Sequence, residues 1–434
     1  MFLSLPVALV SLIYLTNASP DLEIQGSLCL NPSTNTFLNY SQSITEDLSA
    51  ESCSHHKHAI RIPKSKPWSR EPQCLTENMT NESYCVYTNE RFANGRGISF
   101  FTTPSIAAKV TRLLAFTDPK LHNHVNKFDD DPPWEMRNIP GRGNGLFATR
   151  TLRRGDLILA NTPMGVYQSD AFFPDYELGY KYLRKTFDQL PKSSREIFMR
   201  MATHSPGDAV MERINTNAFA GDFEGAPHFL LYPETALMNH DCRPNAMYYH
   251  NVSTLIHATH ASRTIHPGEE ITITYINLLQ TRSQRQELLS SIWGFTCTCR
   301  LCTSPNAHLS DTHVSQILSL QNTLVDPSSS SPHTHTYNTK TLLIPSSQAT
   351  PEMAEQLLAL YAEEHLHAAL GTGHLLAAQV YNGVGDAQMA VWHAKKAVVL
   401  GIVGSVDPES DMAQMRQLIE DPRGHWSFGH RKKR

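Results

Sequence analysis

Residues 239–245 read Asn239-His240-Asp241-Cys242-Arg243-Pro244-Asn245. Further along the chain come Gly268-Glu269-Glu270-Ile271-Thr272-Ile273-Thr274-Tyr275 and then Cys297-x-Cys299-x-x-Cys302. The three motifs carry different chemistry: a polar turn that contains a cysteine, a strand-like segment that ends in a tyrosine, and a cluster of thiols. None of them is specific alone, but their order in one chain indicates a defined site.

The eight cysteines fall into an early and a late group. The late group is Cys242, Cys297, Cys299 and Cys302, and the last three are close enough in sequence for one cation to gather their sulfurs. Because zinc normally takes four nitrogen or sulfur ligands in a tetrahedron, Cys242 is the natural fourth ligand. Four thiolates leave no open position for a substrate, so we expect this zinc to be structural. The alternative is a set of buried or disulfide-bonded thiols.

The segment before the cysteine cluster predicts a strand followed by a short helix. Ile271, Ile273 and Tyr275 alternate with threonines, which is the period of a half-buried strand. Tyr275 then begins a loop, a common position for a catalytic side chain, although a lone tyrosine is more often a packing residue. Thr281-Arg282-Ser283-Gln284 has the form of a capping box, and apolar residues at helical spacing follow it.

Upstream, residues 137–148 contain glycines at positions 141, 143 and 145. Glycine has no Cβ atom, so it suits sharp turns and places where the backbone approaches a ligand closely. An ordinary hairpin turn explains such glycines equally well.

Taken together, these motifs resemble the core of a SET-domain protein-lysine methyltransferase. The similar branch has a zinc-binding cysteine in its Asn-His motif and is SET-and-MYND-like, here without a MYND finger. The resemblance covers about residues 137–302 and implies a mixed β and α fold. That fold combines the small curved sheets of a SET domain with a helical insertion, a zinc-bound post-SET segment and a C-terminal helical, tetratricopeptide-like unit.

The resemblance also implies a cofactor, S-adenosylmethionine, and a role for individual residues. Gly143, Asn144 and Gly145 are expected around the methionine end of the cofactor. Asn239 and His240 are expected to contact the cofactor through side-chain and backbone groups. Phe295 is expected against the adenine ring, and Tyr275 at the point of methyl transfer to a lysine amine. The sequence departs from the family at Asp241, where serine is common.

The expected organisation has seven segments. They are a signal peptide over 1–19, a cysteine-containing region over 20–130, a SET domain over 131–280 with a mostly helical insertion over 168–226, a post-SET zinc segment over 281–302, a helix and flexible linker over 303–350, a C-terminal helical unit over 351–420 and a basic tail over 421–434. In the similar branch the insertion forms one wall of the substrate groove, but a simple packing role is an open alternative. Gly371 and Gly401 are plausible helix stops.

The N-terminal part points to the secretory pathway. Phe2 to Leu15 is an apolar run too short for a comfortable membrane span, and small polar residues follow it. The early cysteines fit an oxidising compartment, with three possible pairings, and four glycosylation triplets occur. The early cysteines are Cys29, Cys53, Cys74 and Cys85, and the triplets begin at Asn39, Asn78, Asn81 and Asn251. The usual cytoplasmic or nuclear location of the family is the alternative, in which the signal is not used.

A formal net charge of −4 argues against broad nucleic-acid affinity. The sequence therefore predicts an S-adenosylmethionine-dependent protein-lysine N-methyltransferase that acts on a protein substrate and has no membrane span. The rival prediction is a secreted or lumenal binding or structural protein that keeps the fold without catalysis. Retention of Asn239, His240 and Tyr275 favours the enzyme, because a scaffold needs none of them.

Overall fold

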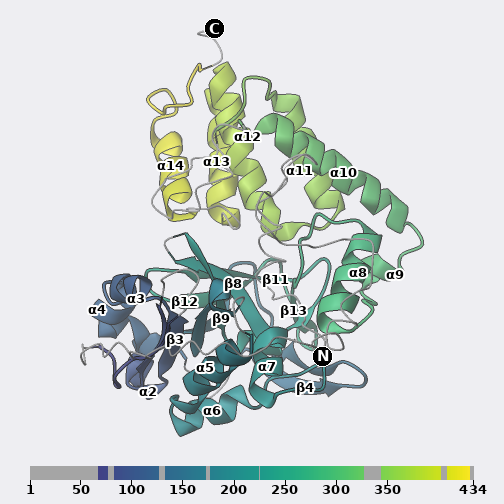
Figure 1. Cartoon of the computed structure of the whole chain (residues 1–434). Coiled ribbons are helices and arrows are strands. Elements are labelled where there is room, and N and C mark those ends of the chain that lie inside the picture. The colour runs from purple at the N-terminus through teal and green to yellow at the C-terminus, as the bar shows by residue number, and fades with distance from the viewer. Residues whose placement is uncertain are drawn as a thin grey trace, which may run out of the picture.

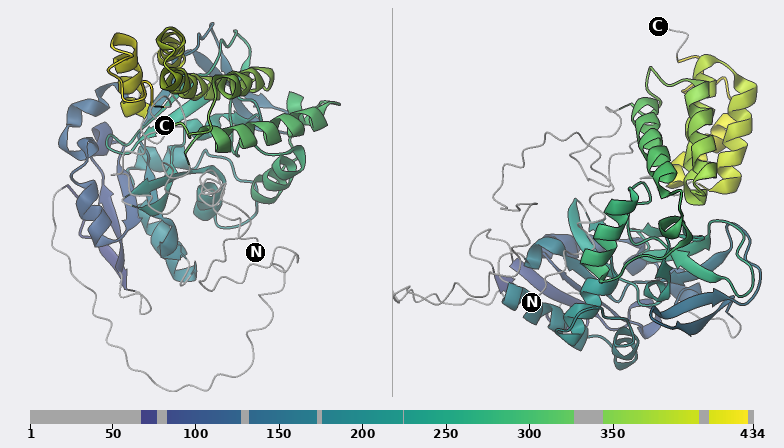
Figure 2. Two further views of the ribbon diagram at one scale, coloured as in Figure 1. Left: turned by 90° about the horizontal axis from the view of Figure 1, so that it is seen from above. Right: turned by 90° about the vertical axis from the view of Figure 1, so that its right-hand side faces the viewer.

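The computed structural model describes residues 67–76, 83–126, 132–172, 176–223, 225–326, 344–401 and 408–430. A body that contains all the strands lies on one side of the molecule, and a layer of long helices lies on the other (Figures 1 and 2). This is the mixed β and α architecture with a C-terminal helical unit that the sequence predicts. The expected signal segment, the basic end of the tail, Cys29, Cys53 and the triplets at Asn39, Asn78 and Asn81 lie outside the described residues.

Three small sheets make up the strand-containing body. Their strand orders are β1-β2-β3-β7-β9-β8, β10-β13-β5-β4 and β11-β12-β6. The bounds are β1 Gln73–Thr76, β2 Ser83–Asn89, β3 Ile98–Thr102, β4 Trp134–Ile139, β5 Gly143–Ala148, β6 Leu157–Asn161, β7 Gly165–Gln168, β8 Ala218–Phe223, β9 Ala226–Leu231, β10 Asn239–His240, β11 Ala246–Asn251, β12 Ile256–Ala261 and β13 Glu270–Ile273. The predicted strand before Tyr275 is therefore confirmed as β13, with its isoleucines buried.

The six-stranded sheet joins the cysteine-containing region to the SET-like core. Strand β3 pairs in parallel with β7, and β7 pairs with β9. The boundary expected near residue 130 therefore does not divide the fold, because strands from both sides of it share one sheet. In the same sheet, Cys74 of β1 and Cys85 of β2 face each other and form a disulfide, one of the pairings that the sequence left open.

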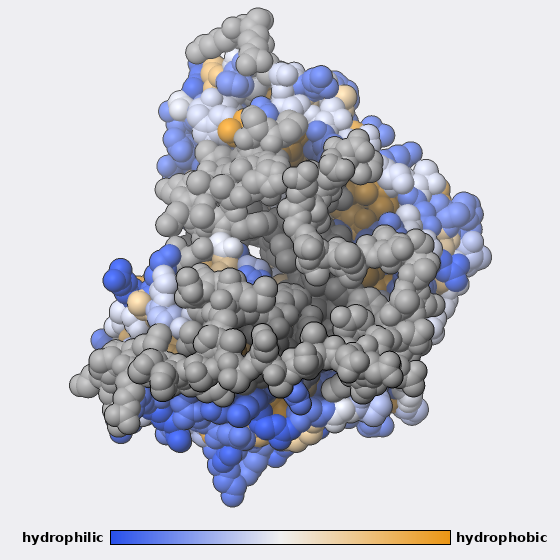
Figure 3. Space-filling view, in the orientation of Figure 1, coloured by the Kyte–Doolittle hydropathy of each residue, from blue (hydrophilic) through white to orange (hydrophobic). Residues whose placement is uncertain are grey.

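The insertion after β7 is helical in its first part only. It contains α5 (Tyr176–Asp188), α6 (Lys192–Phe198) and α7 (Ala209–Asn217), preceded by η3 (Ser169–Phe172). Leu183, Phe198 and Ile214 pack against the six-stranded sheet. The outer surface of this region is mainly hydrophilic (Figure 3), as amphipathic helices require. The chain then enters β8, so the last part of the segment predicted to be mostly helical is a strand; Gly221 fits there because a Cβ would meet the Leu230 side chain of β9 at 2.1 Å.

Shorter elements connect the strands. They are α2 (Phe92–Gly95), α3 (Pro104–Val110), α4 (Leu114–Thr117), η2 (Pro119–His124) and η4 (Thr235–Leu237). After β13 the chain forms α8 (Arg282–Trp293), and the Thr281 capping box is present as predicted. Gly294 ends α8 in the left-handed conformation, and α9 (Arg300–Thr303) follows the cysteine motif.

The C-terminal helical unit consists of α10 to α14. Its elements are α10 (Ala307–Leu324), α11 (Pro351–Glu363), η5 (His367–Ala369), α12 (Leu370–Val384), α13 (Ala387–Leu400) and α14 (Pro408–Glu420). Consecutive helices pack on one another around a shared apolar core that includes Leu357, Tyr361 and Leu375. Gly401 follows α13 as predicted, but Gly371 lies inside α12 and is not a stop, because α11 has already ended at Glu363.

Two arginines of the strand-containing body reach the helical unit. Arg154 donates to the carbonyl oxygens of Leu400 at 2.7 Å and His367 at 3.0 Å, and to that of Ser262 in its own body. Arg243 forms an ion pair with Glu364 at the end of α11. Within the described ranges, no helix combines the length and the apolar character needed to cross a membrane.

Candidate active site and metal centre

The Asn-His segment and the glycine loop meet in the four-stranded sheet. Strand β10, which is Asn239 and His240 alone, lies parallel to β13, and β13 pairs with β5. The Asn239 amide nitrogen donates to the Asn144 carbonyl oxygen at 3.1 Å and to Glu270 Oε1 at 2.9 Å. Arg142 forms an ion pair with the same Glu270 carboxylate at 3.0 Å. Segments far apart in sequence are thus brought together as the sequence predicts.

The two glycines of this loop are required for different reasons. Gly143 has a φ of +74° and nothing within 4 Å of the position of a Cβ, so its backbone conformation is what favours glycine. At Gly145 the reason is space, because a Cβ would lie 2.9 Å from Asn239 Nδ2 and 2.9 Å from Glu270 Oε1. Gly145 therefore allows the Asn239 side chain to reach β5.

His240 links the cysteine cluster to the tyrosine. Its Nδ1 accepts a hydrogen bond from the Tyr275 backbone N–H at 3.1 Å, which places the imidazole proton on Nε2. That nitrogen lies 3.3 Å from Cys242 Sγ and donates toward it. Burial lowers the pKa of His240 to about 4, so the ring is neutral at physiological pH.

Tyr275 is held by its hydroxyl and by its ring. The hydroxyl donates to the Met238 carbonyl oxygen at 2.9 Å, and the ring centroid lies 5.4 Å from His240 and 5.3 Å from Trp293. Burial raises the pKa of Tyr275, so the side chain is a phenol rather than a phenolate at neutral pH. Its oxygen can therefore orient a neighbouring group but does not serve as a base.

A small pocket of about 50 Å³ opens beside Tyr275. Aromatic side chains form part of its lining, which comes from α7, β8, η4, β11, β13, the turn after β13 and α8. The aromatic residues that line it are Phe219, Tyr248, Tyr275 and Trp293. Thr216, Tyr248, Thr274 and Tyr275 add hydroxyl groups, and a narrow pocket of mixed polarity suits a slender chain that ends in a polar group.

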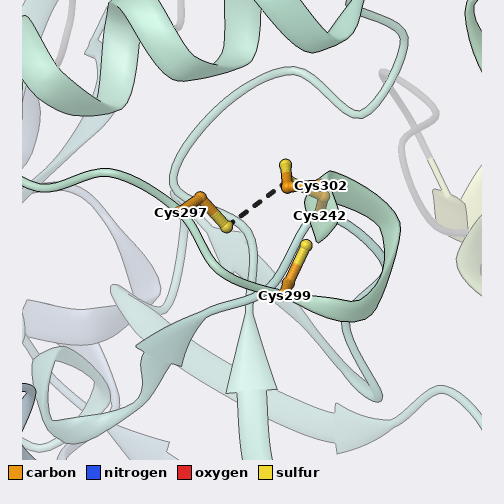
Figure 4. Close-up of side chains that lie close together, drawn as sticks. All are labelled: Cys242, Cys297, Cys299 and Cys302. Carbon is orange, nitrogen blue, oxygen red and sulfur yellow. Dashed lines mark hydrogen bonds between the residues drawn. The ribbon is translucent and has the colours of Figure 1, made fainter. Parts of the chain in front are cut away.

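The four late cysteines converge on one point (Figure 4). Cys242 Sγ lies 3.9 Å from Cys297 Sγ and 3.6 Å from Cys302 Sγ, and all four sulfurs lie within 4.8 Å of one another. Zinc–sulfur bonds of about 2.3 Å in a tetrahedron place the sulfurs about 3.8 Å apart, which fits these distances. The donor set thus fits a structural Zn²⁺ that ties Cys242 to the segment after α8.

The surroundings of the cysteines also fit a metal with four thiolates. Such a centre carries a net negative charge, and the fully buried Arg285 lies with its Nη2 4.0 Å from Cys302 Sγ. Gln286 fixes the backbone of Cys297, accepting from its N–H at 2.9 Å and donating to its carbonyl oxygen at 2.8 Å. A buried cation and oriented ligands are what a metal centre of this kind requires.

Residues 143–276 match the protein-family model described as the SET domain. The chain contains a SET domain. Among the similar proteins are histone-lysine N-methyltransferase set5 of Schizosaccharomyces pombe, 32% identical over 38% of this chain and 48% of that protein, and N-lysine methyltransferase SMYD2 of Mus musculus and of Gallus gallus. The mouse protein is 34% identical over 25% of each chain, and the chicken protein is 38% identical over 21% of each. The matched segments span less than half the length of each relative.

Two further residues of this SET domain shape the site through contacts that could not be inferred from the sequence. Asn245 accepts from the Thr272 N–H at 2.9 Å and donates to the Glu270 carbonyl oxygen at 2.8 Å, which fixes β13 to the Asn-His loop. Asp241, the departure from the usual serine, accepts from the Arg243 N–H at 2.7 Å and so closes the turn before Arg243. Asn245 and Asp241 both lie in the motif of residues 239–245, and this place in the motif could have marked them as residues of the site.

Phe295 lies between the SET domain and the cysteine cluster. Its ring is half-buried, and its centroid is 6.3 Å from that of His240. Trp293 is the residue of this segment that lines the pocket, and its indole N–H donates to the Thr216 carbonyl oxygen of α7 at 3.1 Å. Only the helical spacing of α8 pointed to Trp293, and that spacing could not distinguish a pocket residue from a core residue.

Proposed function

We propose that this chain is an S-adenosylmethionine-dependent protein-lysine N-methyltransferase. The observation that carries the proposal is the position of the Tyr275 hydroxyl, between the aromatic pocket and the strand that bears Asn239 and His240. The SET domain and the named lysine methyltransferases among the relatives support this reaction class.

The residues around Asn239 fit the cofactor. Gly143 and Asn144 are exposed, Glu270 contributes a carboxylate, and Phe295 offers a half-exposed aromatic ring beside His240. S-Adenosylmethionine supplies a methyl group on a sulfonium cation. Gly143, Asn144, Gly145, Asn239 and His240 would hold its amino-acid end, and Phe295 would lie against its adenine ring. A carboxylate close to the site favours a cationic ligand.

The pocket beside Tyr275 fits the alkyl chain of lysine. Aromatic walls attract an ammonium group as it enters, and a water-poor environment lowers the pKa of an amine. The first effect helps the protonated side chain to bind, and the second favours its loss of a proton, which is needed because only the neutral amine is a nucleophile. The Tyr275 oxygen keeps free lone pairs, since its proton is donated to Met238, and it can thus orient the amine for in-line attack.

The test is transfer of tritiated methyl groups from S-adenosylmethionine to a protein array by zinc-loaded protein. Acid hydrolysis of the labelled products should release methylated lysine. Protein that is folded and zinc-loaded but labels no lysine on the array would instead support the rival, a binding or structural protein that keeps the SET fold.

A further inference from the structure

The proposed reaction makes no use of the buried contact between Arg243 and the helical unit. Arg243 directly follows the cysteine Cys242, and Glu364 lies at the C-terminal end of α11. Their side chains are 8% and 6% exposed, and Arg243 Nη2 lies 2.5 Å from Glu364 Oε2. A buried ion pair is costly to break from one side, because the remaining charge is left without a partner.

Arg243 also joins segments that approach the methyl-transfer site. Its Nη1 donates to the carbonyl oxygen of Cys242 at 2.8 Å and to that of Leu278 at 3.2 Å. Cys242 is in the Asn-His loop, and Leu278 is in the loop that leaves Tyr275. One guanidinium therefore holds two backbone segments, the Asn-His loop at Cys242 and the loop after Tyr275 at Leu278. The forked geometry of arginine makes this possible, and lysine does not provide it.

Glu364 is itself held in place by the helical unit. Ser310 of α10 donates to its Oε2 at 2.6 Å, and His313 Nδ1 lies 2.8 Å from its Oε1. Burial alone would raise the pKa of Glu364, but the hydrogen bonds from Ser310, Arg243 and His313 outweigh this effect, so the pKa is lowered and the carboxylate is charged. The next residue but one, Leu366, is buried in the core of the unit. The position of the carboxylate thus depends on how α10 and α11 pack.

We propose that Arg243 is a positioning residue through which the C-terminal helical unit sets the geometry of the cofactor site and of the cysteine cluster. The proposal rests on the proposed function for its effect on the cofactor, but its effect on zinc retention is independent of that function. The helical unit then acts on methyl transfer without contacting the reacting atoms.

The test compares Glu364→Gln and Arg243→Met with Arg154→Met. Glu364→Gln keeps the shape of the side chain and removes the charge, which guards against a failure of Arg243→Met to fold. Arg154→Met is the matched control: it removes the arginine contacts with Leu400 and His367 of the helical unit, and the one with Ser262, but Arg154 donates to neither Cys242 nor Leu278. The readouts are the Kd for S-adenosylmethionine by calorimetry and the rate of zinc release to a chromogenic chelator.

We expect Glu364→Gln and Arg243→Met to weaken cofactor binding at least about tenfold, in the range of ordinary site-to-site coupling. They should also release zinc faster than wild type, and the double variant should be no worse than the worse single variant, because the two residues act as a unit. Arg154→Met should behave as wild type in both assays. Wild-type Kd and wild-type zinc release in Glu364→Gln would overturn the proposal. If wild type itself binds no cofactor, the proposed function fails. The role of Arg243 is then tested by zinc release alone: faster release in the two variants supports it, and wild-type release overturns it.

Discussion

Replacement of Tyr275 by phenylalanine should lower kcat for methyl transfer by about 100-fold or more, the scale on which removal of one oriented polar group acts in an active site. The physical reason is that, in the proposed reaction, the hydroxyl would orient the amine, and it is itself fixed by the Met238 carbonyl oxygen. KM for the protein substrate should change much less, because the aromatic walls of the pocket remain. Steady-state kinetics with the tritiated cofactor measure both quantities.

Tyr361→Phe is the matched control for this variant. The Tyr361 hydroxyl also takes part in a hydrogen bond, from Gln321 at 2.7 Å. Tyr361 belongs to the apolar core of the helical unit, whereas Tyr275 packs against a different core in the SET domain. Tyr361→Phe should lower the free energy of unfolding by about 1 kcal/mol and leave kcat unchanged. Wild-type kcat in Tyr275→Phe would remove the role given to that hydroxyl.

Loss of the metal centre should be the largest effect on stability. Cys297→Ser should lower the zinc content from one ion per chain to near zero and lower Tm by on the order of 10 °C, since a structural zinc contributes several kcal/mol to folding. The reason is that Cys242, Cys297 and Cys302 are buried together and leave adjacent thiols unpaired without the ion. Elemental analysis and a thermal scan measure these changes.

The exposed Thr298, between two of the cysteines, offers the control. Thr298→Ser should keep both the zinc and the wild-type Tm, because its side chain points to solvent. A strong chelator should reproduce the Cys297→Ser result in wild type. Zinc-free wild type with an unchanged Tm would show that the four cysteines do not form a structural zinc site.

The parts of the site that are local in sequence were the predictable ones. The glycine loop, the strand before Tyr275, the capping box of α8 and the cysteine cluster each carry a pattern within a few residues, and the structure forms each of them. Their meeting in one place was predictable only from the resemblance to the SET domain. The spacing of the motifs alone says nothing about the pairing of β10 with β13.

The parts that depend on distant pairing were not predictable. The parallel pairing of β3 with β7 draws the cysteine-containing region into the six-stranded sheet, and nothing within β3 specifies that partner. Strand β8 lies at the end of the segment predicted to be mostly helical, and its partly buried residues carry no clear strand pattern. The pairing of Arg243 with Glu364 spans 121 residues, so neither side chain signals the other.

The location of the protein in the cell stays a prediction. The signal-like segment and three of the four glycosylation triplets lie outside the described residues.

The most direct test of the account is calorimetric titration of zinc-loaded protein with S-adenosylmethionine, with wild type compared to Gly145→Ala and Gly141→Ala. Both glycines lie in or beside the same loop, and Gly141 has a φ of +75° with open space around it, so its replacement strains the backbone without moving Asn239. At Gly145 a Cβ meets Asn239 Nδ2 at 2.9 Å and displaces the side chain. We predict micromolar binding to wild type and to Gly141→Ala, and a loss of at least about tenfold in Gly145→Ala, the cost of roughly one misplaced hydrogen-bonding group. Wild-type protein that is folded and zinc-loaded but produces no binding heat would contradict the account.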